Sequence, residues 1–146
     1  MRISVLSIII CFVLLSTSCR EDERIIPSTP NQVTPGVRGT SVKGFFLLNE
    51  GNMGSNKATL DYFDYETGIY HKNIYAERNP GVVQELGDVG NDIQIYGNKL
   101  YAIINCSHFV EVMNVETAKH ITQISIPNCR YIVFKDKYAY VSSYAG

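Results

Sequence analysis

The sequence predicts an all-β fold, a β-propeller built from four-stranded antiparallel blades. Short stretches rich in β-branched and aromatic residues alternate with tight turns throughout residues 43–146. These stretches group into units that recur at a spacing near 40 residues, which is the period of a propeller blade. A β-sandwich is the competing architecture, but sandwiches do not repeat their own turns.

The composition fits one globular core. The chain has 146 residues, a formal net charge of -1, 45% hydrophobic residues and 18% charged residues. A near-neutral charge offers no basic stripe for a phosphate backbone, so we expect no nucleic-acid partner.

Residues 1–18 are predicted to be a signal peptide. Arg2 supplies a short positive region, and an apolar run from Ile3 to Leu15 follows it. A helix of that length spans about 20 Å, which is too short for a hydrocarbon core of about 30 Å. The small residues of "STSC" follow the run, as expected at a cleavage site.

Cys19 is the predicted lipidation site. The stretch "LLSTSC" resembles the lipobox of bacterial lipoproteins, with Ser16 where an aliphatic residue is usual. The alternative is plain cleavage that leaves Cys19 as a spare thiol. The following "REDER" resembles the surface-export signal of Bacteroidetes lipoproteins, the alternative being a solvated leader. The expected location is the outer membrane, with the protein lipid-anchored and exposed at the cell surface.

Residues 19–42 are predicted to be the lipidated cysteine and a tether. The stretch is polar, carries Pro27, Pro30 and Pro35, and shows no hydrophobic periodicity. Such a segment holds the following domain away from the lipid surface.

The clearest unit of the repeat lies in residues 92–126. Its four predicted strands are "DIQIYG", "KLYAIIN", "FVEVMNVE" and "KHITQISI". A second copy begins with "CRYIVF" and "KYAYVSSY", which places Tyr140 39 residues after Tyr101. Alternating residues in these strands predict a core between blades, namely Ile93, Ile95, Leu100, Ala102, Ile104, Val110, Val112, Ile124 and Ile126.

An earlier copy of the repeat supplies three predicted strands, "FFLLNEG", "ATLDYFDYETG" and "IYHKNIY". Its turn "DYETGI" precedes the matching "NVETAK" by 50 residues, because the segment at 76–91 is inserted between the copies. About two and a half blades cannot close a ring, so residues 43–146 are expected to be an incomplete propeller from a longer protein.

The strands together carry a family resemblance. "FFLLNEGNMGSNKATLDYFDYETGIY", "GNDIQIYGNKLYAIIN", "EVMNVETAKHITQISIP" and "KYAYVSSYAG" resemble the YncE-like, surface-layer-type propeller lipoproteins of Bacteroidetes, most closely the BtuG-type cobalamin-binding group. The resemblance implies a seven-bladed propeller that captures cobalamin or another corrinoid and passes it to a TonB-dependent outer-membrane transporter. The corrinoid would be a transported ligand, and no cofactor is implied.

Strand alternation places the long polar loops together. Loops 49–57 and 105–108 and the insert 76–91 are expected at one face, and the tight turns at the other. Binding residues concentrate on loops held by a rigid scaffold. The candidate ligand-binding residues are Asn49, Glu50, Asn52, Arg78, Asn79, Gln84, Glu85, Asn105, His108, Arg130 and Tyr144. The alternative is that the Asn and Gly residues of these loops only shape turns.

No catalytic motif is present. We find no nucleophile elbow, paired-carboxylate motif, HExxH or phosphate-binding glycine loop, so the protein is expected not to be an enzyme. A propeller lyase or hydrolase stays open, because its residues would come from several blades. The alternative functions are a glycan-binding surface lipoprotein and a scaffold for a protein partner.

Two cysteines and two histidines in residues 105–129 raise the question of a metal site. His120 is expected about 20 Å from Cys106 and His108, at the far end of a strand, so no metal site is predicted. Cys106 and Cys129 share a face, which is compatible with a disulfide or with two free thiols. The His108 imidazole could ligate cobalt, the alternative being an ordinary loop histidine.

Overall fold

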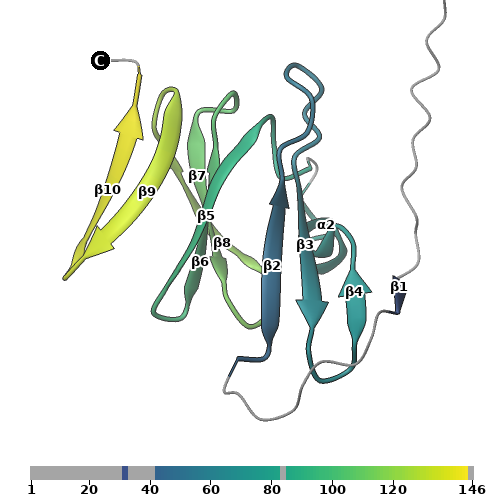
Figure 1. The fold of residues 1–146 in the computed structure, drawn as a ribbon. Helices are drawn as coiled ribbons and strands as arrows, with labels where there is room; N and C mark the ends of the chain where they lie inside the picture. Colours follow the sequence, from purple (N-terminus) through teal and green to yellow (C-terminus); the bar gives the residue numbers. More distant parts are fainter. Residues whose placement is uncertain (1–30, 33–41, 83–84, 145–146) are drawn as a thin grey trace, which may run out of the picture.

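The computed structural model describes residues 31–32, 42–82 and 85–144 (Figure 1). The predicted signal peptide, Cys19 and Gln84 lie outside the described residues. No helix in the described part of the chain is long and apolar enough to cross a membrane.

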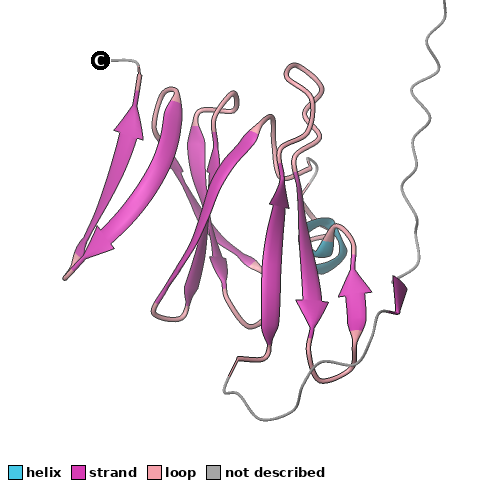
Figure 2. Cartoon of the chain, in the orientation of Figure 1, coloured by secondary structure: helices cyan, strands magenta, loops and turns pink. Residues whose placement is uncertain are grey.

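Strands dominate the described chain (Figure 2). The elements are β1 (Asn31–Gln32), β2 (Gly44–Asn49), β3 (Thr59–Asp64), β4 (Ile69–His71), α2 (Ile74–Arg78), β5 (Gly90–Tyr96), β6 (Lys99–Ile104), β7 (Phe109–Asn114), β8 (His120–Ser125), β9 (Cys129–Lys135) and β10 (Tyr138–Ser143). They form antiparallel sheets in the orders β1-β4-β3-β2, β5-β6-β7-β8 and β10-β9. The predicted all-β class and the four-stranded unit at residues 92–126 are confirmed.

The first sheet differs from the prediction in two places. The expected strand "IYHKNIY" ends at His71, and its second half forms the helix α2. Asn73 adopts a left-handed conformation, φ 49°, and its side chain accepts a hydrogen bond from the Ala76 N–H, which starts the helix. The fourth strand is β1, which pairs with β4 although it lies within the predicted tether.

The core lies between the sheets, and β6 contributes to both sides of it. Leu100, Ala102 and Ile104 point toward the first sheet, where they pack with Leu60 and Tyr75. Ile103, on the opposite face of β6, packs against Cys129 and Ile132 of the third sheet. This two-sided burial explains why β6 reads as a nearly continuous apolar run.

Two of the predicted core residues are exposed. Ile95 is 55% exposed and Ile124 is 47% exposed. Ile95 lies at the end of β5, where it borders a cavity, and Ile124 lies on the outermost strand β8. The prediction was wrong at these positions because strand alternation does not reveal how far each neighbouring sheet extends.

The repeated turns at residues 64–69 and 114–119 have the same geometry. Asp64 Oδ1 accepts hydrogen bonds from the N–H groups of Glu66 and Thr67, at 2.7 and 3.2 Å. Asn114 Oδ1 accepts from the N–H groups of Glu116 and Thr117, at 2.9 and 3.0 Å. An Asx side chain at the first position therefore closes both turns, which gives a physical reason for the repeated "D/N-x-E-T" pattern.

Replacing Asp64 or Asn114 by alanine is expected to lower the free energy of unfolding by about 1 kcal/mol at pH 7, the usual effect of losing a capping side chain. Burial acts to raise the pKa of Asp64, but hydrogen bonds from Glu66 and Thr67 outweigh it and lower the pKa below its ordinary value. Its ionised form thus stabilises the fold above about pH 4, and this contribution is lost as the pH falls through the folded-state pKa.

Urea unfolding at pH 7 and pH 3 tests this. The cost of Asp64→Ala should shrink at pH 3, whereas the cost of Asn114→Ala, whose amide does not titrate, should stay constant. Equal pH dependence in the two variants would contradict the turn assignment.

Candidate functional site

The long loops meet at one end of the three sheets (Figure 1). We call this the loop end and define it as residues 50–58, 86–89, 105–108 and 126–128. Backbone hydrogen bonds join its segments, from Gly90 N–H to Glu50 O at 3.0 Å and from Ile126 N–H to His108 O at 2.9 Å. The structure therefore brings these loops together, as strand alternation predicts.

Asp88 links the loops, and sequence reasoning missed it. Its Oδ2 accepts a hydrogen bond from the Gly54 N–H at 2.7 Å, and its own N–H donates to Ser107 Oγ at 2.8 Å. Its carbonyl accepts from the Cys106 N–H at 3.1 Å. One acidic residue thus holds three loops in register. The available signal was its place in "GDVGN", between two glycines that let the backbone turn sharply.

Asn49 is held inside the first sheet. Its Nδ2 donates to Thr59 Oγ1 at 3.0 Å and to Asp61 Oδ2 at 2.9 Å. Asp61 also accepts from the Tyr70 hydroxyl at 2.8 Å. Burial, followed by the hydrogen bond and charge of Asp61, raises the pKa of Tyr70 to about 12. The amide of Asn49 therefore stabilises the strand ends and is not directed toward a ligand.

Asn105 is also structural. It is 3% exposed, and its Nδ2 donates to the Cys129 carbonyl at 2.8 Å, which joins the second sheet to the third. Its Oδ1 accepts from the Cys106 thiol at 3.4 Å. The Nδ2 donor and the Oδ1 acceptor of Asn105 are thus both used within the protein.

The two cysteines are free thiols in the structure. Cys129 Sγ is directed to the carbonyls of Ile104 and Phe109, whereas Cys106 Sγ contacts Asn105. Burial raises the pKa of the Cys129 thiol, which lowers its reactivity. Of the two alternatives, the structure has the free thiols.

Six candidate residues are exposed at or beside the loop end, namely Glu50, Asn52, Glu85, His108, Arg130 and Tyr144. The Arg130 guanidinium lies over the Tyr144 ring, 5.0 Å from its centroid, in a cation–π contact. His108 has φ 61°, and its Nδ1 accepts from the Asn128 N–H at 3.1 Å. Neutral His108 therefore carries its proton on Nε2. That tautomer does not favour cobalt ligation through Nε2, which needs the lone pair there.

Two candidate residues of the insert, Arg78 and Asn79, are not at the loop end, whereas Glu85 directly precedes it. Asn79 is buried, and its Nδ2 donates to the carbonyls of Tyr75 and Ala118. Arg78 pairs with Glu77 at 3.5 Å, and Glu85 accepts from Asn73 at 2.9 Å. Asn79 lies away from the loop end because the insert begins with α2, which packs beside the turn at 115–118 before the chain reaches the loop end.

A cavity of about 740 Å³ lies between the first two sheets, at the opposite end. We call this the turn end and define it by the turns at 65–68, 97–98, 115–119 and 136–137. Phe46 and Tyr62 line the cavity, with ring centroids 4.8 Å apart, together with Ile74 and the charged Lys43 and Lys119. Sequence reasoning missed the cavity, because the turns that border it are short and carry no ligand-binding motif.

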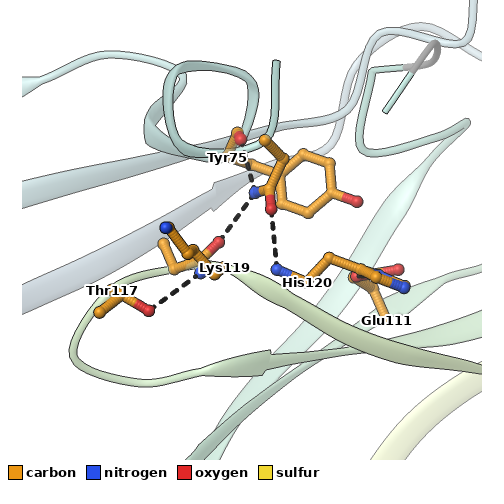
Figure 3. A network of polar contacts seen from close by, with 7 residues as sticks. Tyr75, Glu111, Thr117, Lys119 and His120 are labelled. Atoms are coloured by element: carbon orange, nitrogen blue, oxygen red, sulfur yellow. Dashed lines mark hydrogen bonds and ion pairs between the residues drawn. The ribbon is translucent and has the colours of Figure 1, made fainter. Parts of the chain in front are cut away.

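His120 contacts the buried Glu111 close to α2 (Figure 3). His120 Nδ1 is 2.6 Å from Glu111 Oε1, and the Glu111 side chain is completely buried. Burial raises the pKa of Tyr75, and the nearby Glu111 carboxylate raises it further. Among residues 31–32, 42–82 and 85–144, no group of three or more His, Cys, Asp or Glu side chains could hold a metal ion.

The comparisons with known proteins identify a family by sequence. A family model described as a domain of unknown function, DUF5074, matches residues 43–146. A comparison with curated proteins finds no match. Since the matched region covers most of the chain and contains every exposed candidate residue, the chain belongs to the DUF5074 family.

Proposed function

We propose that this protein is a surface lipoprotein that captures a corrinoid at its loop end and passes it to a TonB-dependent outer-membrane transporter. The observation that carries the proposal is the gathering of loops from all three sheets at one end, where Glu50, Asn52, His108, Arg130 and Tyr144 are exposed. Rigid strands hold these loops, an arrangement that suits selective binding.

The proposed complete fold is a seven-bladed propeller, of which the three sheets would be the first blades. Each described sheet has its strands in meander order, apart from the added β1. The first strands of successive sheets are neighbours, since β2 contacts β5 and β5 contacts β9. The outer faces of the first and third sheets expose aromatic side chains, including Phe45, Tyr131 and Tyr140, as expected where further sheets would pack.

The exposed side chains suit a corrinoid, whose macrocycle is fringed with amide groups. Asn52 can donate to and accept from an amide, Glu50 can accept, and Arg130 can donate. The Arg130–Tyr144 pair offers a flat surface for the macrocycle. The lipidation of Cys19 and the membrane location rest on the lipobox-like sequence at the N-terminus.

Titration of the full-length protein with cyanocobalamin in a calorimeter tests the proposal. We expect binding at micromolar or lower concentration, and affinity at least about tenfold weaker for Arg130→Ala and for Tyr144→Ala, as is typical of contact residues at the centre of a site. Arg78→Ala, at the turn end, is the control and should bind as the unmodified protein does. Affinity no better than millimolar for the unmodified protein would exclude corrinoid capture.

A further inference from the structure

The edge of β8 (His120–Ser125) is open. β8 is the last strand in the order β5-β6-β7-β8, and within the described residues no strand pairs with its outer edge. All six of its residues are exposed. The outer strand of the first sheet is different, because β1 pairs with β4 through Asn31 and Gln32. The open edge of β8 therefore needs an explanation of its own.

The hydrogen-bond alternation shows which groups point outward. The Ile126 N–H bonds to the His108 carbonyl, just beyond the strand pair. In an antiparallel ladder, bonded and non-bonded pairs alternate, so Ile124 and Thr122 also direct their backbone groups to β7. Gln123 and Ser125 consequently direct theirs outward, whereas the bulge interrupts the alternation at Ile121. Gln123 and Ser125 therefore offer free donors and acceptors at the edge.

β8 has a bulge at Ile121 but lacks the other features that usually protect an edge strand. Natural sheets block open edges with lysine, proline, inward charges, bulges or a covering segment. The sequence "HITQIS" contains no lysine, proline or carboxylate. Ile121 and Ile124 are 46% and 47% exposed, so apolar side chains flank the free backbone groups on this strand. The edge therefore favours addition of another strand.

We propose that β8 pairs antiparallel with β8 of a second copy, across a two-fold axis centred on Gln123. This register pairs Gln123 with Gln123 of the second copy through two backbone hydrogen bonds, and it sets each Ser125 opposite the bulged Ile121 of the other copy. Thr122 then lies opposite Ile124 of the second copy. The two four-stranded sheets become one continuous sheet of two copies.

The second copy is the occupant that the strand itself fits. A two-fold interface requires a self-complementary surface. β8 meets this requirement, because it carries no fixed charge that would face its own symmetry mate and its β-branched residues pair with one another. The proposal does not depend on the ligand of the loop end.

Cysteine cross-linking of the full-length, membrane-anchored protein tests the pairing. In a Cys106→Ser background, Gln123→Cys places two thiols opposite each other, at a Cα separation of about 5.5 Å that a disulfide can span. Thr122→Cys is the matched control, because its symmetry mate lies two positions further along. Mild oxidation should cross-link Gln123→Cys on the order of tenfold more than Thr122→Cys.

A second measurement separates this interface from apolar contacts elsewhere on the surface. Ile124→Lys should abolish the Gln123→Cys cross-link, whereas Ile95→Lys, at a residue that is 55% exposed at the turn end, should leave it unchanged. Circular dichroism should show that both variants are folded. Equal cross-linking at positions 122 and 123, no cross-link at 123, or loss of the cross-link with Ile95→Lys would each overturn the proposal.

Discussion

Replacing His120 by alanine is expected to lower the free energy of unfolding by about 2 kcal/mol, because it removes a hydrogen-bond partner of a buried carboxyl group. His120 Nδ1 is 2.6 Å from Glu111 Oε1, and the Glu111 side chain is 0% exposed. The second carboxyl oxygen, Oε2, has no hydrogen-bond partner. Without His120, Oε1 would also lose its hydrogen bond in the core.

Urea unfolding of a set of variants measures this effect. Thr122→Ala, on the same strand, is the matched control and should cost less than about 0.5 kcal/mol, as for other surface substitutions. The double variant Glu111→Leu with His120→Leu should be much more stable than His120→Ala, because replacing a whole buried pair by apolar residues is often neutral. A loss below about 1 kcal/mol for His120→Ala would show that the pair does not stabilise the fold.

The contact between His120 and Glu111 illustrates what the sequence does not reveal. The alternation of "FVEVMNV" places Glu111 on one face of its strand but does not say what covers that face. In the structure the cover is α2, since Asn79 Oδ1 accepts from the His120 N–H at 2.8 Å and Tyr75 lies near Glu111. The strand propensity of "IYHKNIY" led to the prediction of a strand where this helix begins. The signal that could have predicted it is Asn73, a favourable N-cap before the helix-forming "AER".

The strands themselves were predictable, because period-two alternation and tight turns are local properties. The second sheet confirms this at each of its four strands. The segregation of loop and turn ends also follows from alternating strand direction. The roles of individual candidate residues depend instead on long-range contacts, which the sequence does not show. Asn49 and Asn105 have the polarity of ligand-binding residues, yet both form hydrogen bonds to neighbouring strands. Sequence alone locates the candidate surface, but it does not distinguish the residues exposed there from those whose side chains form hydrogen bonds within the fold.

Gly87→Ala, at the loop end, is expected to lower the free energy of unfolding by about 3 kcal/mol or more. Gly87 has φ +131°, where any side chain is strained, which costs about 1–3 kcal/mol. A Cβ there would lie 2.6 Å from Ile104 Cγ2 and 2.9 Å from Ser107 Oγ. Relieving such overpacking costs about another 1–3 kcal/mol. Because the Gly87 carbonyl also accepts from the Ala58 N–H at 2.8 Å, the substitution should displace three loops together.

Two other glycines provide matched controls for the separate causes. Gly54 has φ +79° but no atom within 4 Å of an added Cβ, so Gly54→Ala should cost only about 1 kcal/mol of backbone strain. Gly81 has neither a positive φ nor a neighbour within 4 Å, and Gly81→Ala should be almost neutral. Urea unfolding should therefore rank the losses as Gly87, Gly54 and Gly81. If Gly87→Ala costs no more than Gly54→Ala, the close approach of the loops at Gly87 does not stabilise the loop end. The capture proposal, which depends on loops held rigidly together, would then lose its structural support.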